Sequence, residues 1–143
     1  MMKSIPVWKQ ELSDGVHAAR LASLYCCAPA ETASEAARYA AVLDGLEKTF
    51  GSHAEAGLYS APGRTEIGGN HTDHQHGRVL AGSVNIDMIA AAAPNDKNQL
   101  RVQSEGYDLC VIDLNDLEAR KEEENTTAAP VSYTHLRAHE TCA

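Results

Sequence analysis

The sequence lacks the features of a membrane-spanning or secreted chain. Its longest apolar run, Met88 to Ala93, is far too short to cross a bilayer. No apolar segment follows Lys3, as a secretory signal would require. The four cysteines include no CxxC pair, and the neighbours Cys26 and Cys27 cannot readily bridge each other. These absences predict a cytoplasmic protein with reduced thiols.

Basic residues are also scarce, because 12 Lys and Arg stand against 20 Asp and Glu, for a formal charge of −8. Nucleic acids and anionic membranes bind clustered cations, so the balance argues against both as partners. With 43% hydrophobic and 22% charged residues, the composition is that of an ordinary globular domain. The length of 143 residues suits one domain or part of one, and nothing in the sequence indicates an oligomeric state.

The residue pattern predicts an α+β fold, with N-terminal helices followed by a mostly antiparallel sheet. We expect Ser13 or Asp14 to cap a helix through residues 17–24. The next helix is expected to begin at a T-x-x-E capping box formed by Thr32 and Glu35. Its apolar residues recur at helical spacing, with a glycine where a helix should end: Ala36, Ala40, Leu43, Leu46, Phe50 and then Gly51.

Strands are expected after residue 57. A short strand at residues 58–60 should end at Pro62 and Gly63, and a loop rich in Gly and His should follow as far as Gly77. After Val79 and Leu80, further strands are expected at 83–90, 100–102 and 109–112, with short turns between them that favour an antiparallel meander. In the second strand, one set of residues alternates with another: Val84, Ile86, Met88 and Ala90 with Ser83, Asn85, Asp87 and Ile89.

The last thirteen residues, 131–143, resemble a translated sequencing adaptor and are left out of the expected domain, which spans residues 1–130. A real polar tail is the alternative. His135 and His139 are four residues apart and could face one metal ion on a helix, an interpretation that we give little weight.

The residues with the clearest chemical character lie between Ala61 and Leu80. This segment brings Arg64, Asp73 and three histidines together with four glycines. Glycines allow the backbone to approach a ligand closely, and polar side chains on a loop held by strands commonly bind ligands. A carboxylate accepts two neighbouring hydroxyl donors, so the segment suits the recognition of a sugar.

The same segment resembles the galactokinase motif of the GHMP-type small-molecule kinases, PGR-x-N-x-IGEH-T-D-Y-x-x-G-x-VLP. The matching residues are Pro62, Gly63, Arg64, Gly69, His71, Thr72, Asp73, Gly77, Val79 and Leu80. The resemblance extends over roughly residues 10–120. It implies the first part of the GHMP kinase N-terminal domain, which has the ribosomal protein S5 domain 2-like fold.

The resemblance also implies roles for individual residues. Asp73 matches the aspartate that holds galactose hydroxyls, and Asn70 and His71 lie at the positions that complete the sugar site. Arg64 matches an arginine that stabilises the transferring phosphoryl group, which suits a reaction catalysed by positioning and charge neutralisation. The implied activity is transfer of the ATP γ-phosphate to the anomeric hydroxyl of galactose, with ATP and Mg2+ as cofactors of the full-length protein.

The sequence departs from the motif at several positions. Asn70 replaces the family glutamate, and Asn offers a neutral donor as well as an acceptor, so the exact sugar is left open. Glu66 stands where the family has Asn, and His74 where it has Tyr. A divergent subgroup is therefore expected.

The nucleotide-binding loop and the catalytic aspartate of the family are not found in the sequence, nor is a Walker pattern. We therefore expect this chain to be an inactive N-terminal portion with no bound cofactor. The alternative function is a non-catalytic, galactokinase-like sugar sensor. A weaker alternative is a metal site formed by His71, His74, His76 and Asp73, and with the kinase motif around them we expect no metal there.

Overall fold

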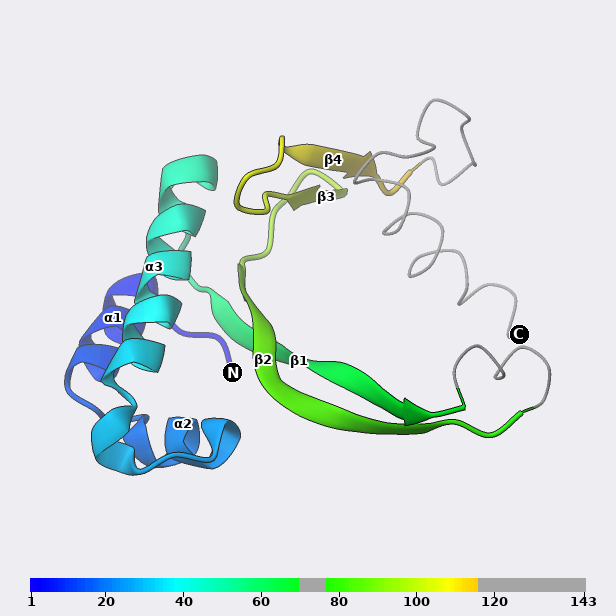
Figure 1. Ribbon diagram of the computed structural model, residues 1–143. Helices are drawn as coiled ribbons and strands as arrows, with labels where there is room; N and C mark the ends of the chain where they lie inside the picture. The colour runs from blue at the N-terminus through cyan, green and yellow to red at the C-terminus, as the bar shows by residue number, and fades with distance from the viewer. Residues whose placement is uncertain (70–76, 116–143) are drawn as a thin grey trace. The chain divides into compact units, whose positions relative to one another are not determined.

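The computed structural model describes residues 1–69 and 77–115 (Figure 1). The chain divides into two compact units, one from Met1 to Pro94 and the other from Asn95 onwards. The first unit contains three α-helices, a short 3-10 helix and a long β-hairpin. The second contains a smaller pair of strands. Helices followed by antiparallel strands make this an α+β fold, as the sequence predicts.

The helical region has one more α-helix than the sequence analysis placed, and also a short 3-10 helix. Its elements are α1 (Ile5–Ser13), α2 (Ala18–Tyr25), η1 (Pro29–Glu31) and α3 (Ala33–Phe50). A proline in the first turn of α1 fits there because that turn has no backbone partner for its N–H groups. The predicted cap at Ser13 or Asp14 is wrong. These residues end α1, and α2 follows His17 without a side-chain cap.

Both ends of α3 were expected close to where they lie, but its start has a different chemistry. Thr32 occupies the N-cap position, yet its hydroxyl donates to the Pro29 carbonyl at 2.8 Å and does not cap the helix. The predicted capping box with Glu35 is therefore wrong, because η1 takes up the threonine hydroxyl. Gly51 ends the helix at a φ of 83°, a conformation that glycine adopts without strain.

The core of the first unit lies among the three helices and against one face of the hairpin. Leu43 of α3 is fully buried, and the periodic face of this helix is confirmed. The buried core residues are Ile5, Leu12, Leu21, Tyr25, Tyr39, Leu43, Leu46 and Ala56. Hairpin residues Leu58, Ile89 and Ala91 pack against this cluster from the strands. Burial of such side chains is the main stabilising term for a small unit.

The N-terminal segment is bound to the chain just before the hairpin. Lys3 and Ala56 form an isolated antiparallel bridge, with two backbone hydrogen bonds of 3.1 and 2.8 Å. The Trp8 indole N–H donates to the same Ala56 carbonyl at 2.8 Å. Ala56 is fully buried, so its backbone groups are satisfied by residues about fifty positions earlier.

The hairpin pairs β1 (Gly57–Gly68) with β2 (Leu80–Ala92) in antiparallel register. Both strands are longer than expected. The prediction that β1 ends at Pro62 and Gly63 is wrong, because the strand continues to Gly68. The register shifts between Pro62 and Arg64, and an irregularity of this kind accommodates a proline, which has no N–H to donate to the ladder.

The two faces of β2 differ in how they are covered. The helices cover the face that carries Asp87, Ile89 and Ala91. Ile86 and Met88 alternate with these residues and are each 77% exposed. The strand pattern of the sequence is confirmed, but the covered set includes an aspartate and the open set holds large apolar side chains.

The second unit pairs β3 (Gln99–Val102) with β4 (Cys110–Asp113), again antiparallel. The connection turns at Gly106, which has a φ of 79°. The predicted meander is wrong in one respect. The described strands form two separate two-stranded sheets, since β2 pairs with β1 alone and β3 with β4 alone.

Two expectations about the whole chain can be compared with the described residues. No helix within residues 1–69 and 77–115 is both long and apolar enough to cross a membrane. In the same part of the chain, the neighbours Cys26 and Cys27 are not bridged to each other, as the sequence predicts.

Candidate functional site

The far end of the hairpin carries the described part of the predicted sugar motif. We call residues 63–69 and 77–83 the motif arm. All of these residues are exposed except Gly82, which is half-buried. In Figure 1 the arm extends from the part of the hairpin on which the helices pack. The arm therefore presents its side chains and the ends of the predicted sugar loop to solvent.

Gly69 closes the arm where the loop begins. Its φ is 86°, and a Cβ at this position would lie 2.2 Å from the Arg78 carbonyl oxygen and 2.9 Å from the Val79 Cα. No side chain fits at those distances, so the backbones of the two strands approach each other closely only because residue 69 is glycine. The sequence identified this glycine as a motif residue, and the geometry explains why it has no side chain.

Gly63 was expected in a loop but lies within β1, next to the register shift. A Cβ there would be 3.1 Å from the Ile86 carbonyl oxygen and 3.1 Å from a Val84 methyl carbon. The position is tight because the opposite strand is close. Gly77 is exposed and lies three residues before β2 begins.

Arg64, the predicted catalytic cation, lies in β1 and pairs in register with Ser83. Its side chain is exposed, and it forms no hydrogen bond or ion pair with residues 1–69 or 77–115. Glu66 lies two positions further along the same strand. A guanidinium that no described carboxylate neutralises is available to bind an anion.

The predicted sugar-binding residues Asn70, His71 and Asp73 lie outside the described residues, as do His74 and His76. Their roles stay predictions. The described residues contain no group of three His, Cys, Asp or Glu side chains able to hold a metal ion. The structure thus brings Arg64 and the three motif glycines onto one hairpin, around the segment that contains the predicted sugar ligands.

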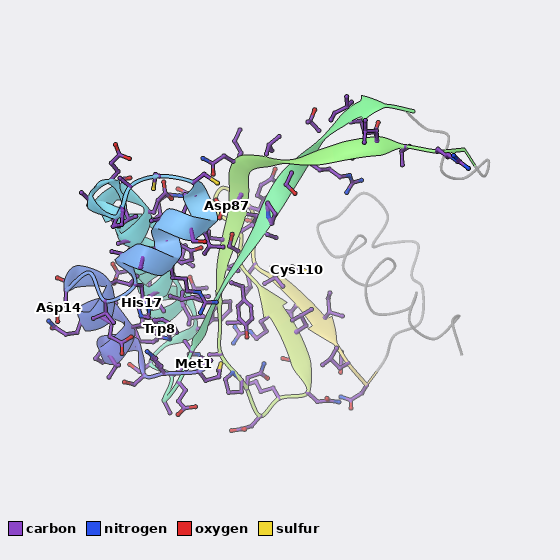
Figure 2. The ribbon with its side chains drawn as sticks, turned by 90° about the horizontal axis from the view of Figure 1, so that it is seen from below. Met1, Trp8, Asp14, His17, Asp87 and Cys110 are labelled. Atoms are coloured by element: carbon purple, nitrogen blue, oxygen red, sulfur yellow. The ribbon has the colours of Figure 1, made fainter. Side chains whose placement is uncertain are left out.

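A second polar cluster, which the sequence analysis did not find, lies where the helices meet the hairpin (Figure 2). Asp87 of β2 has a side chain only 6% exposed. Its carboxylate accepts hydrogen bonds from the Tyr25 hydroxyl at 2.5 Å, the Ser60 hydroxyl at 2.6 Å and the Arg38 guanidinium at 2.8 Å. The three donors come from α2, β1 and α3 respectively.

The donors to Asp87 are themselves held in place. The Tyr25 hydroxyl lies 3.1 Å from the Tyr39 hydroxyl, and the Tyr25 carbonyl accepts a bond from the Asn85 amide at 3.1 Å. Arg38 also pairs with Glu35 at 2.5 Å and lies over the Tyr25 ring. This network satisfies the polar atoms that the helices bury against the strands.

The electrostatics of the cluster favour an ionised aspartate. Burial disfavours the charge on Asp87, but the hydrogen bonds from Ser60, Tyr25 and Arg38 outweigh it and lower the pKa of the carboxyl to about 2. Burial, together with the hydrogen bond to Asp87, raises the pKa of Tyr25 above its ordinary value. Tyr25 therefore stays a neutral donor and Asp87 a charged acceptor at neutral pH. One sequence signal could have found this site, namely that Asp87 is the single charged residue of β2.

A third polar cluster lies at the start of the chain. Glu11 accepts from Lys3 at 2.5 Å and contacts the His17 ring at 2.7 Å, and these bonds lower the pKa of its carboxyl. The His17 ring also lies beside Trp8 (Figure 2). The residues of this third cluster are paired with one another, and their contacts therefore stabilise the start of the helical region.

Comparison with known proteins assigns the hairpin to a recognised signature. Residues 46–94 match the galactokinase galactose-binding signature. This range contains the end of α3, both strands of the hairpin and the loop between them. The match therefore includes the motif arm and Asp87 alike.

The similar proteins are galactokinases. The chain is 35% identical to the galactokinase of Ligilactobacillus salivarius (strain UCC118) over 83 residues, which make up 56% of this chain and 21% of that protein. It is 33% identical to a galactokinase of Lacticaseibacillus casei over 66 residues, or 46% of this chain and 17% of the relative. For a galactokinase of Streptococcus suis (strain 05ZYH33) the identity is 34% over 71 residues, or 48% and 18%.

The chain spans about a fifth of the length of the curated relatives that it matches. No solved structure matches it significantly. The resemblance to galactokinases that the motif predicts is confirmed over this part of the chain.

Proposed function

We propose, from the galactokinase galactose-binding signature in residues 46–94, that this chain is the sugar-binding part of a galactokinase-type sugar kinase. The full protein would transfer the γ-phosphate of ATP to the anomeric hydroxyl of galactose. The finer fold follows from the same resemblance. Residues 1–130 would be the first part of a GHMP kinase N-terminal domain, of the ribosomal protein S5 domain 2-like class, and residues 131–143 would lie outside it. The protein would act in the cytoplasm.

The proposed sugar ligands are Asn70, His71 and Asp73. An ionised aspartate accepts hydrogen bonds from two neighbouring hydroxyl groups, and such charge-assisted bonds are stronger than neutral ones. Imidazole and amide groups can each donate or accept, which lets them distinguish the orientation of a hydroxyl group. The close approach of the strands at Gly69 supports this role, because it fixes one end of the segment that contains all three ligands.

Arg64 is proposed to face the phosphoryl group. Its side chain is exposed on β1 and has no carboxylate partner among residues 1–69 and 77–115, so its charge is available to an anion. ATP with Mg2+ would supply the phosphoryl group when bound, and we assign its binding to no residue of this chain. Charge neutralisation at the transferred group is the main task of protein side chains in phosphoryl transfer.

Galactose titration of the chain tests the sugar site. We expect galactose to shift the backbone amide NMR signals of Gly63, Arg64, Gly69 and Gly77, and Asp73→Ala to weaken binding by about 100-fold through loss of charged hydrogen bonds. Asp96→Ala is the matched control, because Asp96 is exposed and lies outside the matched range. Unchanged galactose affinity in Asp73→Ala would remove the site assignment.

The choice between a kinase and a sugar sensor needs a longer protein. Turnover of galactose with ATP and Mg2+ in a protein of the relatives' length, lost in Arg64→Ala, would support the kinase. Galactose binding without turnover in that protein would support the sensor. Zinc binding that needs His71, His74 and His76, with no response to galactose, would contradict both.

A further inference from the structure

The Asp87 cluster joins four elements of the first unit next to the motif arm. Asp87 belongs to β2, and its three hydrogen-bond donors belong to α2, β1 and α3. A carboxylate is the one side-chain group that can accept from all three, since it has two oxygen atoms and no donor. An asparagine in its place would turn an N–H2 group towards at least one donor.

The cluster lies immediately before the motif arm in the hairpin register. Asp87 pairs with Pro62, and the next residues of β1 are Gly63 and Arg64. The regular ladder runs from Gly57 to Pro62 and shifts its register directly afterwards. Ser60 donates to Asp87 across the hairpin and lies two positions before Pro62 in β1.

Beyond the register shift, no helix among residues 1–69 and 77–115 buries the β1 side of the arm. Residues 61–69 are all exposed, whereas Leu58, Ile89 and Ala91 on the near side pack on the helical core. The orientation of the arm is therefore determined at its base. At that base, where Asp87 pairs with Pro62, the buried charged group is the Asp87 carboxylate, and its positive partner is Arg38 of α3.

On the basis of the proposed sugar site, we propose that Asp87 is a positioning residue that orders the motif arm, although its side chain hydrogen-bonds to Tyr25, Arg38 and Ser60 and to no residue of the arm. It acts through Ser60 on β1 and through its own backbone on β2, while Arg38 and Tyr25 bind both strands to the helices. The carboxylate must be ionised to accept from all three donors. The groups facing it are Tyr25, Arg38 and Ser60, with Tyr39 and Glu35 behind them.

Amide hydrogen exchange of the 143-residue chain tests the proposal. We expect Asp87→Asn to raise the exchange rates of residues 63–69 and 77–83 by about tenfold or more, because a buried charge-assisted network is lost. Ser60→Ala should raise exchange mainly in β1 and leave α2 and α3 protected, since it removes the β1 bond alone. Asp96→Asn makes the same chemical change at an exposed site and should have no effect.

A core variant compared at matched free energy of unfolding separates positioning from general destabilisation. Leu12→Ala removes a buried side chain of α1 that lies in the core and not at the hairpin base. In denaturant adjusted so that both variants have the same free energy of unfolding, arm exchange should be faster in Asp87→Asn than in Leu12→Ala. Equal arm exchange in these two variants would overturn the proposal. So would an arm without protection in the unmodified chain.

Galactose titration of the same samples keeps the two proposals apart. Absence of galactose-induced shifts in the unmodified chain would contradict the sugar site and leave the exchange comparison valid. If the chain binds galactose, Asp87→Asn should weaken binding while Asp96→Asn should not. Normal galactose affinity in Asp87→Asn would contradict the positioning role and leave the sugar site intact.

Discussion

The two ends of the β1–β2 hairpin differ in almost every physical respect. At the near end, Leu58, Ile89 and Ala91 pack against three helices, and Asp87 joins four elements through one buried carboxylate. At the far end the side chains are exposed, and the closest constraint is the contact of Gly69 with the backbone of Arg78. One pair of strands thus combines a packed base with an open arm, and the recognised motif lies on the arm. Packing and the proposed sugar recognition are therefore separated along the strands.

The largest expected effect tests the packed end. Leu43→Ala should lower the free energy of unfolding by about 2–5 kcal/mol, because it removes a fully buried side chain and leaves a cavity. Denaturant unfolding followed by circular dichroism measures it. Leu24→Ala makes the same change at a side chain 52% exposed and should cost less than about 1 kcal/mol. Similar losses in both variants would contradict the core described here.

The next effect concerns the junction between the two ends. The pKa of Asp87 is lowered to about 2, below its ordinary value of 3.8, so ionised Asp87 stabilises the folded state above pH 4. That contribution is lost as the pH falls from about 4 to about 2. We expect the difference in free energy of unfolding between the unmodified chain and Asp87→Asn to be about 2 kcal/mol at pH 6. It should shrink over that interval, and a difference independent of pH would contradict the assignment.

A smaller effect tests the open end. Gly69→Ala should cost about 1–3 kcal/mol, because its Cβ would clash with the Arg78 carbonyl and its φ of 86° is strained for alanine. Gly68→Ala is a close control, since no atom lies within 4 Å of the Cβ position at residue 68. The comparison is measured by unfolding and by amide exchange at residues 77–79. Equal tolerance of both alanines would show that the strands do not approach at residue 69.

The smallest effect compares the two faces of one strand. Ile89→Val should lower the free energy of unfolding by about 0.5–1.5 kcal/mol, because Ile89 packs on the helical core. Ile86→Val removes the same methylene from a side chain that is 77% exposed and should change stability by less than about 0.3 kcal/mol. Thermal unfolding of the two variants side by side gives the answer. A larger loss at Ile86 would mean that the face carrying Ile86 is the covered one.

Sequence reasoning located the elements better than it located their partners. The periodic apolar residues of α3 and the stop at Gly51 depend on local geometry, so a short window contains enough information. The extension of β1 through Pro62 could not be found in this way, because its strand conformation depends on pairing with residues 12 to 25 positions away. The cap at Thr32 failed for a related reason, since the preceding turn competes for the same hydroxyl.

The candidate site was predictable in part. Arg64 and the motif glycines were identified from a pattern of residue types, and the structure brings them onto one hairpin. Asp87 was missed because its importance arises from Tyr25, Arg38 and Ser60, which lie between 27 and 62 residues away in sequence. Local patterns identify groups that contact a ligand more readily than groups that act through the packing of distant elements.

The bridge between Lys3 and Ala56 has a consequence for folding during synthesis. The chain emerges from the ribosome N-terminus first, so Lys3 must wait for more than fifty further residues before its backbone partner appears. Helices α1 to α3 can form in that interval, because their hydrogen bonds are local. On a stalled nascent chain, we expect the helical region to be incompletely packed until Ala56 has left the exit tunnel. It should become resistant to proteases only then.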